Sequence, residues 1–190
     1  MRMLDFIIQD ITRYLSQYIE SAIIVAAIFA LGRLVAALFL MLIGKEKAYW
    51  KKWVKILLSL PVDFAAAFYV FMVVVITFFS RIEGSTDVVN LQLFSTFGMD
   101  LQSKIFIIEN IVMFIPLGMF VRWYGIKRWW LGPPLITGAS TLIEIMQYTT
   151  GRGRMEVDDI LTNTIGGFIG FIVMKLVFGI KYLVQKRSSK

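Results

Sequence analysis

The chain has 190 residues, of which 58% are hydrophobic and 15% aromatic, and its mean hydropathy is +0.73. Soluble domains are about 45–50% apolar, so this composition indicates a membrane protein of about one domain. Basic residues outnumber acidic ones by 20 to 13, which in a membrane chain signals topology rather than nucleic-acid binding. Cysteine and histidine are absent, which excludes disulfides, thiolate-ligated or histidine-ligated zinc, and nucleophile pairs that need histidine.

Hydropathy predicts an all-α, polytopic membrane bundle of about five spanning helices. Residues 1–17 place apolar side chains at helical spacing, which favours an amphipathic interfacial helix; the alternative is a lead-in turn of the first span. This lead-in and the lack of an A-x-A site argue against a cleaved signal, so we expect the N-terminus to be retained. A five-span domain then covers residues 18–190, with spans at about 18–43, 56–79, 105–123, 131–148 and 157–180.

Two charged residues lie inside the first two predicted spans. Arg33 sits in the middle of the first, where an arginine costs roughly 3 kcal/mol on insertion scales, so we expect it to face a carboxylate. Asp63, early in the second span, is the candidate partner, and snorkelling of Arg33 is the alternative. The polar segment at residues 81–104 contains a short extended pattern at 88–93, which predicts either a strand or an interfacial loop.

The basic residues concentrate in three segments that alternate with the predicted spans. These segments are residues 44–55, 122–128 and 175–190. Cytoplasmic loops of membrane proteins are enriched in Lys and Arg, so the pattern predicts an N-terminus outside and a C-terminus in the cytoplasm. The acids follow the opposite trend and gather at the outer ends of the last three spans.

Polar side chains that are costly in a bilayer converge at this outer level. The third span contributes a Glu–Asn pair, the fourth a Glu and a Gln three residues apart, and the fifth begins with acids and an asparagine. Residues three or four apart share a helix face, so we expect a small outward-facing pocket among the three spans. The predicted binding residues are Glu109, Asn110, Glu144, Gln147, Arg152, Arg154, Glu156, Asp158, Asp159 and Asn163.

Small residues in the fifth span predict close helix packing, because Gly166, Gly167 and Gly170 leave room for a neighbouring backbone. A structural alternative also explains the acids. Carboxylates in the first turn of a helix favour its dipole, and Arg152 or Arg154 then simply pairs with Glu144.

The chain's second half carries a series of short motifs: Asn110, Phe114-Ile115-Pro116-Leu117-Gly118, Glu144-x-x-Gln147, Gly151-Arg152-Gly153, Asp158-Asp159-Ile160, Asn163-Thr164 and Gly166-Gly167. Together these motifs resemble those of the VanZ-like family, a group of small bacterial membrane proteins, and the resemblance covers about residues 88–171. Three positions depart from the family pattern: Glu156 replaces an aspartate, Arg154 a small residue and Leu93 a proline.

The resemblance implies a role in the bacterial cell envelope, with reduced susceptibility to teicoplanin-type glycopeptides. Two mechanisms fit the residues. In the first, the polar pocket binds a lipid head group, a lipid-linked envelope precursor or the antibiotic.

In the second, the protein is a hydrolase or transferase that acts on a lipid-linked phosphate at the outer leaflet. Glu109, Glu144 and Asp159 are then the candidate ligands for Mg²⁺ or another hard divalent ion, and Glu144, Asp158 and Asp159 are the candidate catalytic residues. A transporter is disfavoured, because five spans do not divide into equal halves and no internal repeat is evident.

Overall fold

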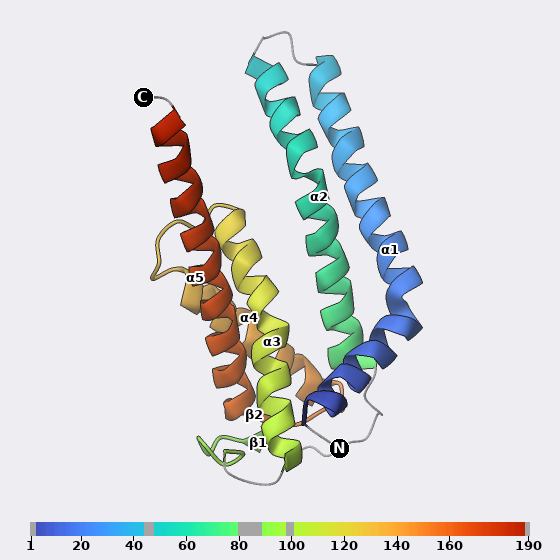
Figure 1. The fold of residues 1–190 in the computed structure, drawn as a ribbon. Helices are drawn as coiled ribbons and strands as arrows, with labels where there is room; N and C mark the ends of the chain where they lie inside the picture. Colours follow the sequence, from blue (N-terminus) through green and yellow to red (C-terminus); the bar gives the residue numbers. More distant parts are fainter. Residues whose placement is uncertain (1–2, 44–47, 80–88, 98–100, 189–190) are drawn as a thin grey trace. The chain divides into compact units, whose positions relative to one another are not determined.

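The computed structural model describes residues 3–43, 48–79, 89–97 and 101–188. Helices dominate these residues, and the only strands among them are two short ones (Figure 1). The elements in chain order are α1 (Met3–Ile43), α2 (Ala48–Val74), the π-helical segment η1 (Val75–Phe79), β1 (Val89–Asn90), α3 (Leu101–Trp123), α4 (Gly132–Thr149), β2 (Met155–Glu156) and α5 (Val157–Ser188).

The predicted all-α membrane class is confirmed. Within the described residues, four stretches are long and apolar enough to cross a membrane: Asp5–Leu42, Trp53–Phe79, Leu101–Trp123 and Val157–Ser188. Helix α4 is absent from this group, since its 18 residues include the buried polar side chains of Ser140, Glu144 and Gln147. About five spanning helices and an N-terminal amphipathic helix were expected, and the described residues form five α-helices and the π-helical segment η1. The crossing of the bilayer by α4 stays a prediction.

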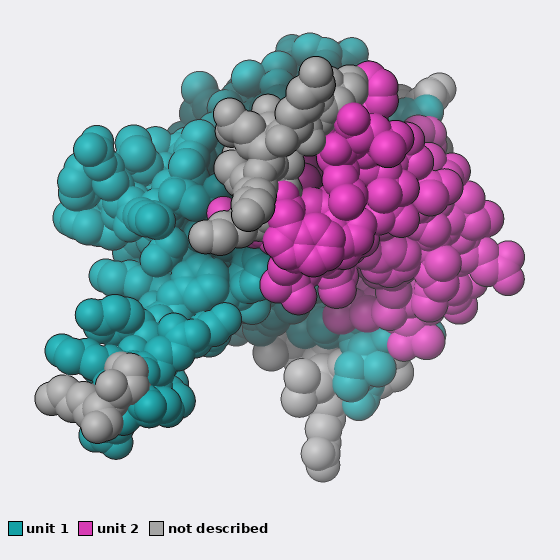
Figure 2. All heavy atoms as spheres, turned by 90° about the horizontal axis from the view of Figure 1, so that it is seen from above, with its two compact units in different colours: residues 1–9, 80–190 teal, residues 10–79 magenta. Residues whose placement is uncertain are grey.

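The chain forms two compact units, coloured separately in Figure 2. One unit comprises residues 10–79 and therefore contains most of α1, all of α2 and η1. The other comprises residues 1–9 and 80–190 and contains α3, α4, α5 and both strands. All the predicted binding residues belong to this second unit.

Helix α1 is one unbroken helix of 41 residues. At 1.5 Å per residue it is about 60 Å long, roughly twice the thickness of a bilayer's hydrocarbon core. It therefore contains the described part of the predicted amphipathic segment together with the predicted first span; residues 1–2 lie outside the described residues. The division of this helix into an interfacial part and a spanning part stays a prediction.

In the second unit, α5 packs against both α3 and α4, and most of its packing is with α3. Glycines bring α3 and α5 close together. A Cβ atom at Gly166 would overlap the carbonyl oxygen of Ile111, and one at Gly170 would overlap the carbonyl oxygen of Ile115. The predicted close approach of the fifth helix is confirmed, and its partner is α3.

The two strands pair in parallel, with Val89 opposite Met155 and Asn90 opposite Glu156. The extended segment predicted at 88–93 is thus a strand over two residues; Val88 lies outside the described residues. This pairing ties the chain that precedes α3 to the chain that precedes α5. It places the start of α5 next to the loop at residues 91–97, where the polar cluster begins.

Candidate functional site

The first turn of α5 holds the loop at residues 94–96 through the carboxylate of Asp158. The backbone N–H of Phe94 donates to Oδ1 at 2.7 Å, and the backbone N–H of Thr96 donates to Oδ2 at 3.0 Å. The hydroxyls of Thr96 and Ser95 also donate to Oδ2, at 2.7 and 3.3 Å. Asp158 is only 2% exposed, so its charge is balanced by four donors rather than by water. Its role in this arrangement is to fix the loop.

The neighbouring acid, Asp159, faces α3 instead. Its Oδ1 accepts a hydrogen bond of 2.9 Å from Nδ2 of Asn110. Both side chains are half-buried, and Glu109, the residue before Asn110, is half-buried as well. Two consecutive aspartates therefore serve two different neighbours, because successive side chains on a helix point about 100° apart.

The polar face of α4 is buried against the rest of the unit. Glu144 and Gln147 are each 2% exposed. Oε2 of Glu144 accepts a 3.0 Å hydrogen bond from the backbone N–H of Glu156 in β2. Glu144 thereby anchors the strand that leads into α5, and the same strand pairs with β1.

Asn163 joins α5 to α4 one turn after Asp159. Its Nδ2 donates to Oγ of Ser140 at 2.9 Å, and both residues are almost completely buried. Among the described residues, the buried Oδ1 of Asn163 has no hydrogen-bond partner. Thr137 and Thr164 make a second polar link between these helices, with their hydroxyl oxygens 3.0 Å apart.

The connection between α4 and α5 presents the two predicted arginines at the rim of this cluster. Gly151 has a φ of 63°, which favours glycine, and its N–H donates to the carbonyl of Tyr148 at 3.1 Å. The N–H of Arg152 donates to the carbonyl of Gln147 at 2.9 Å, which completes a Schellman motif at the end of α4. Arg152 is half-buried and Arg154 is exposed.

The predicted metal ligands do not come together. Within the described residues, which include Glu109, Glu144 and Asp159, no group of three or more Asp, Glu, His or Cys side chains is placed to hold an ion. The expectation of a carboxylate cage shared by three helices is therefore not met. Asp159 instead accepts a hydrogen bond from Asn110 of α3, and Glu144 accepts one from the backbone N–H of Glu156 in β2.

The sequence predicted the acids and amides of the cluster, but not most of their partners. Ser140 was missed, although it lies four residues before Glu144 and so shares its helix face. The donors of the loop at residues 94–96 were also missed. They lie more than 60 residues from Asp158 in the chain, and no periodic pattern signals a contact at that separation.

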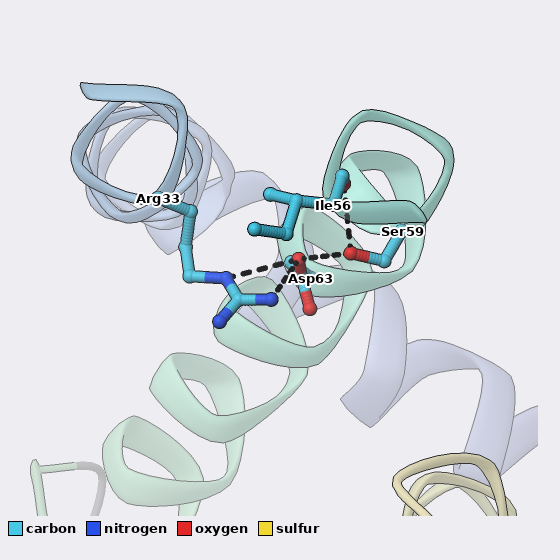
Figure 3. A network of polar contacts seen from close by, with 4 residues as sticks. All are labelled: Arg33, Ile56, Ser59 and Asp63. Carbon is cyan, nitrogen blue, oxygen red and sulfur yellow. Dashed lines mark hydrogen bonds and ion pairs between the residues drawn. The ribbon is translucent and has the colours of Figure 1, made fainter. Parts of the chain in front are cut away.

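The predicted intramembrane ion pair forms in the other unit. Nε and Nη2 of Arg33 both lie 3.2 Å from Oδ2 of Asp63, as Figure 3 shows. The hydroxyl of Ser59 donates to the same oxygen at 2.9 Å. The side chain of Asp63 is 2% exposed and that of Arg33 is 43% exposed, so the carboxylate is enclosed while part of the guanidinium is not. The negative charge of Asp63 is compensated by these neighbouring donors, as a carboxylate in an apolar helix requires.

Comparison with known proteins agrees with the sequence motifs described above. A family model described as VanZ/LLP1 matches residues 64–178. Protein VanZ of Enterococcus faecium is 32% identical over 87 residues, which are 44% of this chain and 51% of that protein. The chain thus spans about half the length of this relative. No solved structure matches it.

The family match includes the last part of α2 from residue 64, all of η1, α3 and α4, and most of α5. It contains every residue of the polar cluster, whereas Arg33 and Asp63 lie before it. Because the match covers more than half of the 190 residues, this chain is a membrane protein of the VanZ/LLP1 family.

Proposed function

We propose that the chain is a bacterial envelope protein that lowers susceptibility to teicoplanin-type glycopeptides. Its polar cluster binds a lipid head group, a lipid-linked envelope precursor or the antibiotic. The observation that carries the proposal is the hydrogen-bonded layer in which α3, α4, α5 and the 94–96 loop meet, together with the two arginines of the connection between α4 and β2.

The layer and the rim have different tasks in this proposal. The carboxylates of Asp158 and Glu144 accept hydrogen bonds from the backbone of the loop and of β2, so they hold these segments in place. Arg152 and Arg154 follow directly after the end of α4 and supply guanidinium groups at the rim. A guanidinium forms paired hydrogen bonds with a phosphate or a carboxylate, which are groups that a lipid-linked precursor carries.

The proposed topology places this rim outside the cell, with the N-terminus outside and the C-terminus in the cytoplasm. Because the chain has no cysteine, single cysteines report the side directly. Arg154→Cys should react with a membrane-impermeant maleimide in intact cells, whereas Lys181→Cys, which is also exposed, should react only after permeabilisation. Labelling in the reverse order contradicts the topology and the binding of an extracytoplasmic ligand.

The functional test measures teicoplanin susceptibility in a host that expresses each variant at a verified level. Arg154→Gln, Glu144→Gln and Asp159→Asn should lose most of the protection that the wild type gives. Glu20→Gln, a matched change of an exposed acid in α1, should keep it. Arg154 is the decisive position because its side chain is exposed, so its replacement should disturb the buried layer less than replacement of Glu144 or Asp159. Full protection by Arg154→Gln at normal expression contradicts the proposal.

No specific observation favours the metal-dependent enzyme as a second function. Its ligand set is not assembled among the described residues, as reported above. The carboxylates of the cluster instead accept hydrogen bonds from backbone and amide donors.

A further inference from the structure

A second concentration of charge lies at the opposite end of the same unit, where α3 connects to α4. Figure 1 shows this connection beside α5, far from β1 and β2. The surrounding sequence contains no acid: there is no Asp or Glu at positions 110–143 or 160–190. The cations in these stretches are Arg122, Lys127, Arg128, Lys175, Lys181, Lys186, Arg187 and Lys190. The sequence on both sides of the α3–α4 connection and along α5 from residue 160 is therefore basic.

Aromatic rings hold the two arginines of the connection. Cζ of Arg122 lies 5.0 Å from the ring centroid of Phe178 in α5, and the ring of Trp123 lies 5.6 Å from the same ring. Cζ of Arg128 lies 5.6 Å from the ring centroid of Trp130. A cation over an aromatic face is stabilised and oriented while its N–H edges stay available to an acceptor.

Arg122 is incompletely satisfied. Its Nε is buried and has no hydrogen-bond partner among the described residues. Leaving a buried donor without an acceptor costs about 1–3 kcal/mol, and more for a charged group. Arg122 therefore keeps an unmet donor at Nε within the described part of the unit, and only its other N–H groups are open to an acceptor from outside.

The backbone at this point is fixed, so the arginines are presented from a defined turn. Gly125 has a φ of 110°, its N–H donates to the carbonyl of Arg122 at 3.4 Å, and the N–H of Ile126 donates to the carbonyl of Val121 at 3.3 Å. These two bonds form a Schellman motif at the end of α3. On the facing helix, Lys175 and Lys181 are exposed three residues to either side of Phe178, on the same side of α5.

We propose that the α3–α4 connection and the facing part of α5 bind the phosphate of an anionic phospholipid. Arg122 and Arg128 supply the guanidinium groups, while Trp129 and Trp130, whose centroids are 6.2 Å apart, lie at head-group level. Basic pockets beside membrane helices bind phosphate head groups in this way. The assignment requires neither the glycopeptide role nor a particular orientation of the chain in the membrane.

The test compares lipid retention by the purified full-length chain in native mass spectrometry. The probes are phosphatidylglycerol and phosphatidylcholine with identical acyl chains. The wild type should prefer phosphatidylglycerol, and Arg122→Gln with Arg128→Gln should reduce that preference about tenfold or more, as expected for lost charged hydrogen bonds. Lys104→Gln is the matched control, because it removes an exposed cation from the other end of α3. It should keep the wild-type preference.

Three results overturn the proposal. One is an unchanged preference in the double variant, and another is an equal loss in Lys104→Gln, which reports net charge rather than a site. The third is complete displacement of phosphatidylglycerol by an equal concentration of inorganic phosphate, which identifies free phosphate rather than the lipid as the preferred ligand. If Arg122→Gln fails to fold, the single variant Arg128→Gln decides the question, because the side chain of Arg128 is exposed and its replacement should not affect folding. This variant should still reduce the preference for phosphatidylglycerol.

Discussion

The close approach of α3 and α5 makes a sharp prediction for two glycines of the same helix. In Gly166→Ala the new methyl group overlaps the carbonyl oxygen of Ile111, a backbone atom that cannot rotate away. In Gly179→Ala nothing lies within 4 Å of the new methyl group. The chemical change is identical at both positions, so the second variant is a matched control for the first.

The magnitudes follow from two opposing effects. Replacing glycine by alanine inside a helix gains up to about 1 kcal/mol in both variants. Overpacking costs about 1–3 kcal/mol or more, and the upper end applies to Gly166 because the contact is with backbone. Gly166→Ala should therefore lose about 2 kcal/mol, whereas Gly179→Ala should be neutral or gain up to about 1 kcal/mol. In a chain of this size, Gly166→Ala should therefore lower Tm by about 4–8 °C, and Gly179→Ala should raise it by at most about 2–4 °C.

The assay is thermal unfolding of the purified chain in one detergent, followed by circular dichroism and by loss of the monodisperse peak in size-exclusion chromatography. Both variants are compared with the wild type at equal protein concentration. A Tm for Gly166→Ala at or above the wild-type value refutes the reasoning. An equal loss in Gly179→Ala does so as well, because the loss then does not depend on α3.

Three further predictions concern the polar contacts. Asp158→Asn places an amide N–H₂ against the donors of the 94–97 loop, so it should cost about 1–3 kcal/mol and expose that loop to limited proteolysis; unchanged cleavage contradicts this role. Arg33→Gln and Asp63→Asn should each lower Tm, and the double variant should be milder than their sum by about 1 kcal/mol; strictly additive losses mean that the pair is not coupled. Ser140→Ala removes the acceptor for a buried amide of α5 and should cost about 1–3 kcal/mol in the same melting assay, whereas a wild-type Tm argues that the contact is dispensable.

Hydropathy depends on apolar side chains, so it predicted the bounds of the apolar spans and not the bounds of the helices that contain them. The second span was expected to begin at residue 56, but α2 begins at Ala48, within the basic connector. The fifth was expected to end at residue 180, but α5 continues to Ser188. Lysine, arginine and glutamine are good helix formers, so a helix continues through polar residues that an apolar average excludes. The start of α5 at Val157 agrees with the prediction, because the polarity changes at that residue.

The polar cluster was predictable in its membership but not in its pairing. Helical periodicity and topology predict which residues lie at one depth and on one helix face. They do not predict which neighbouring segment that face contacts. The amide of Asn110 pairs with Asp159 as a contact between two predicted members. By contrast, Asp158 contacts a loop more than 60 residues away, and Glu144 contacts a backbone N–H of β2. The backbone N–H groups that take part in both contacts have no side-chain signature in the sequence.

Side chains that lie at the same depth need not contact one another, and this determines where a ligand can bind. Residues that share a depth suggested one cage of carboxylates, but Asp158, Asp159 and Glu144 accept hydrogen bonds from three different partners. Asp158 and Glu144 are each 2% exposed and bonded to backbone, so a ligand that reached them would have to displace the loop or β2. The exposed Arg154 requires no such displacement. Binding is therefore expected to depend directly on the rim and indirectly on the buried acids that hold it.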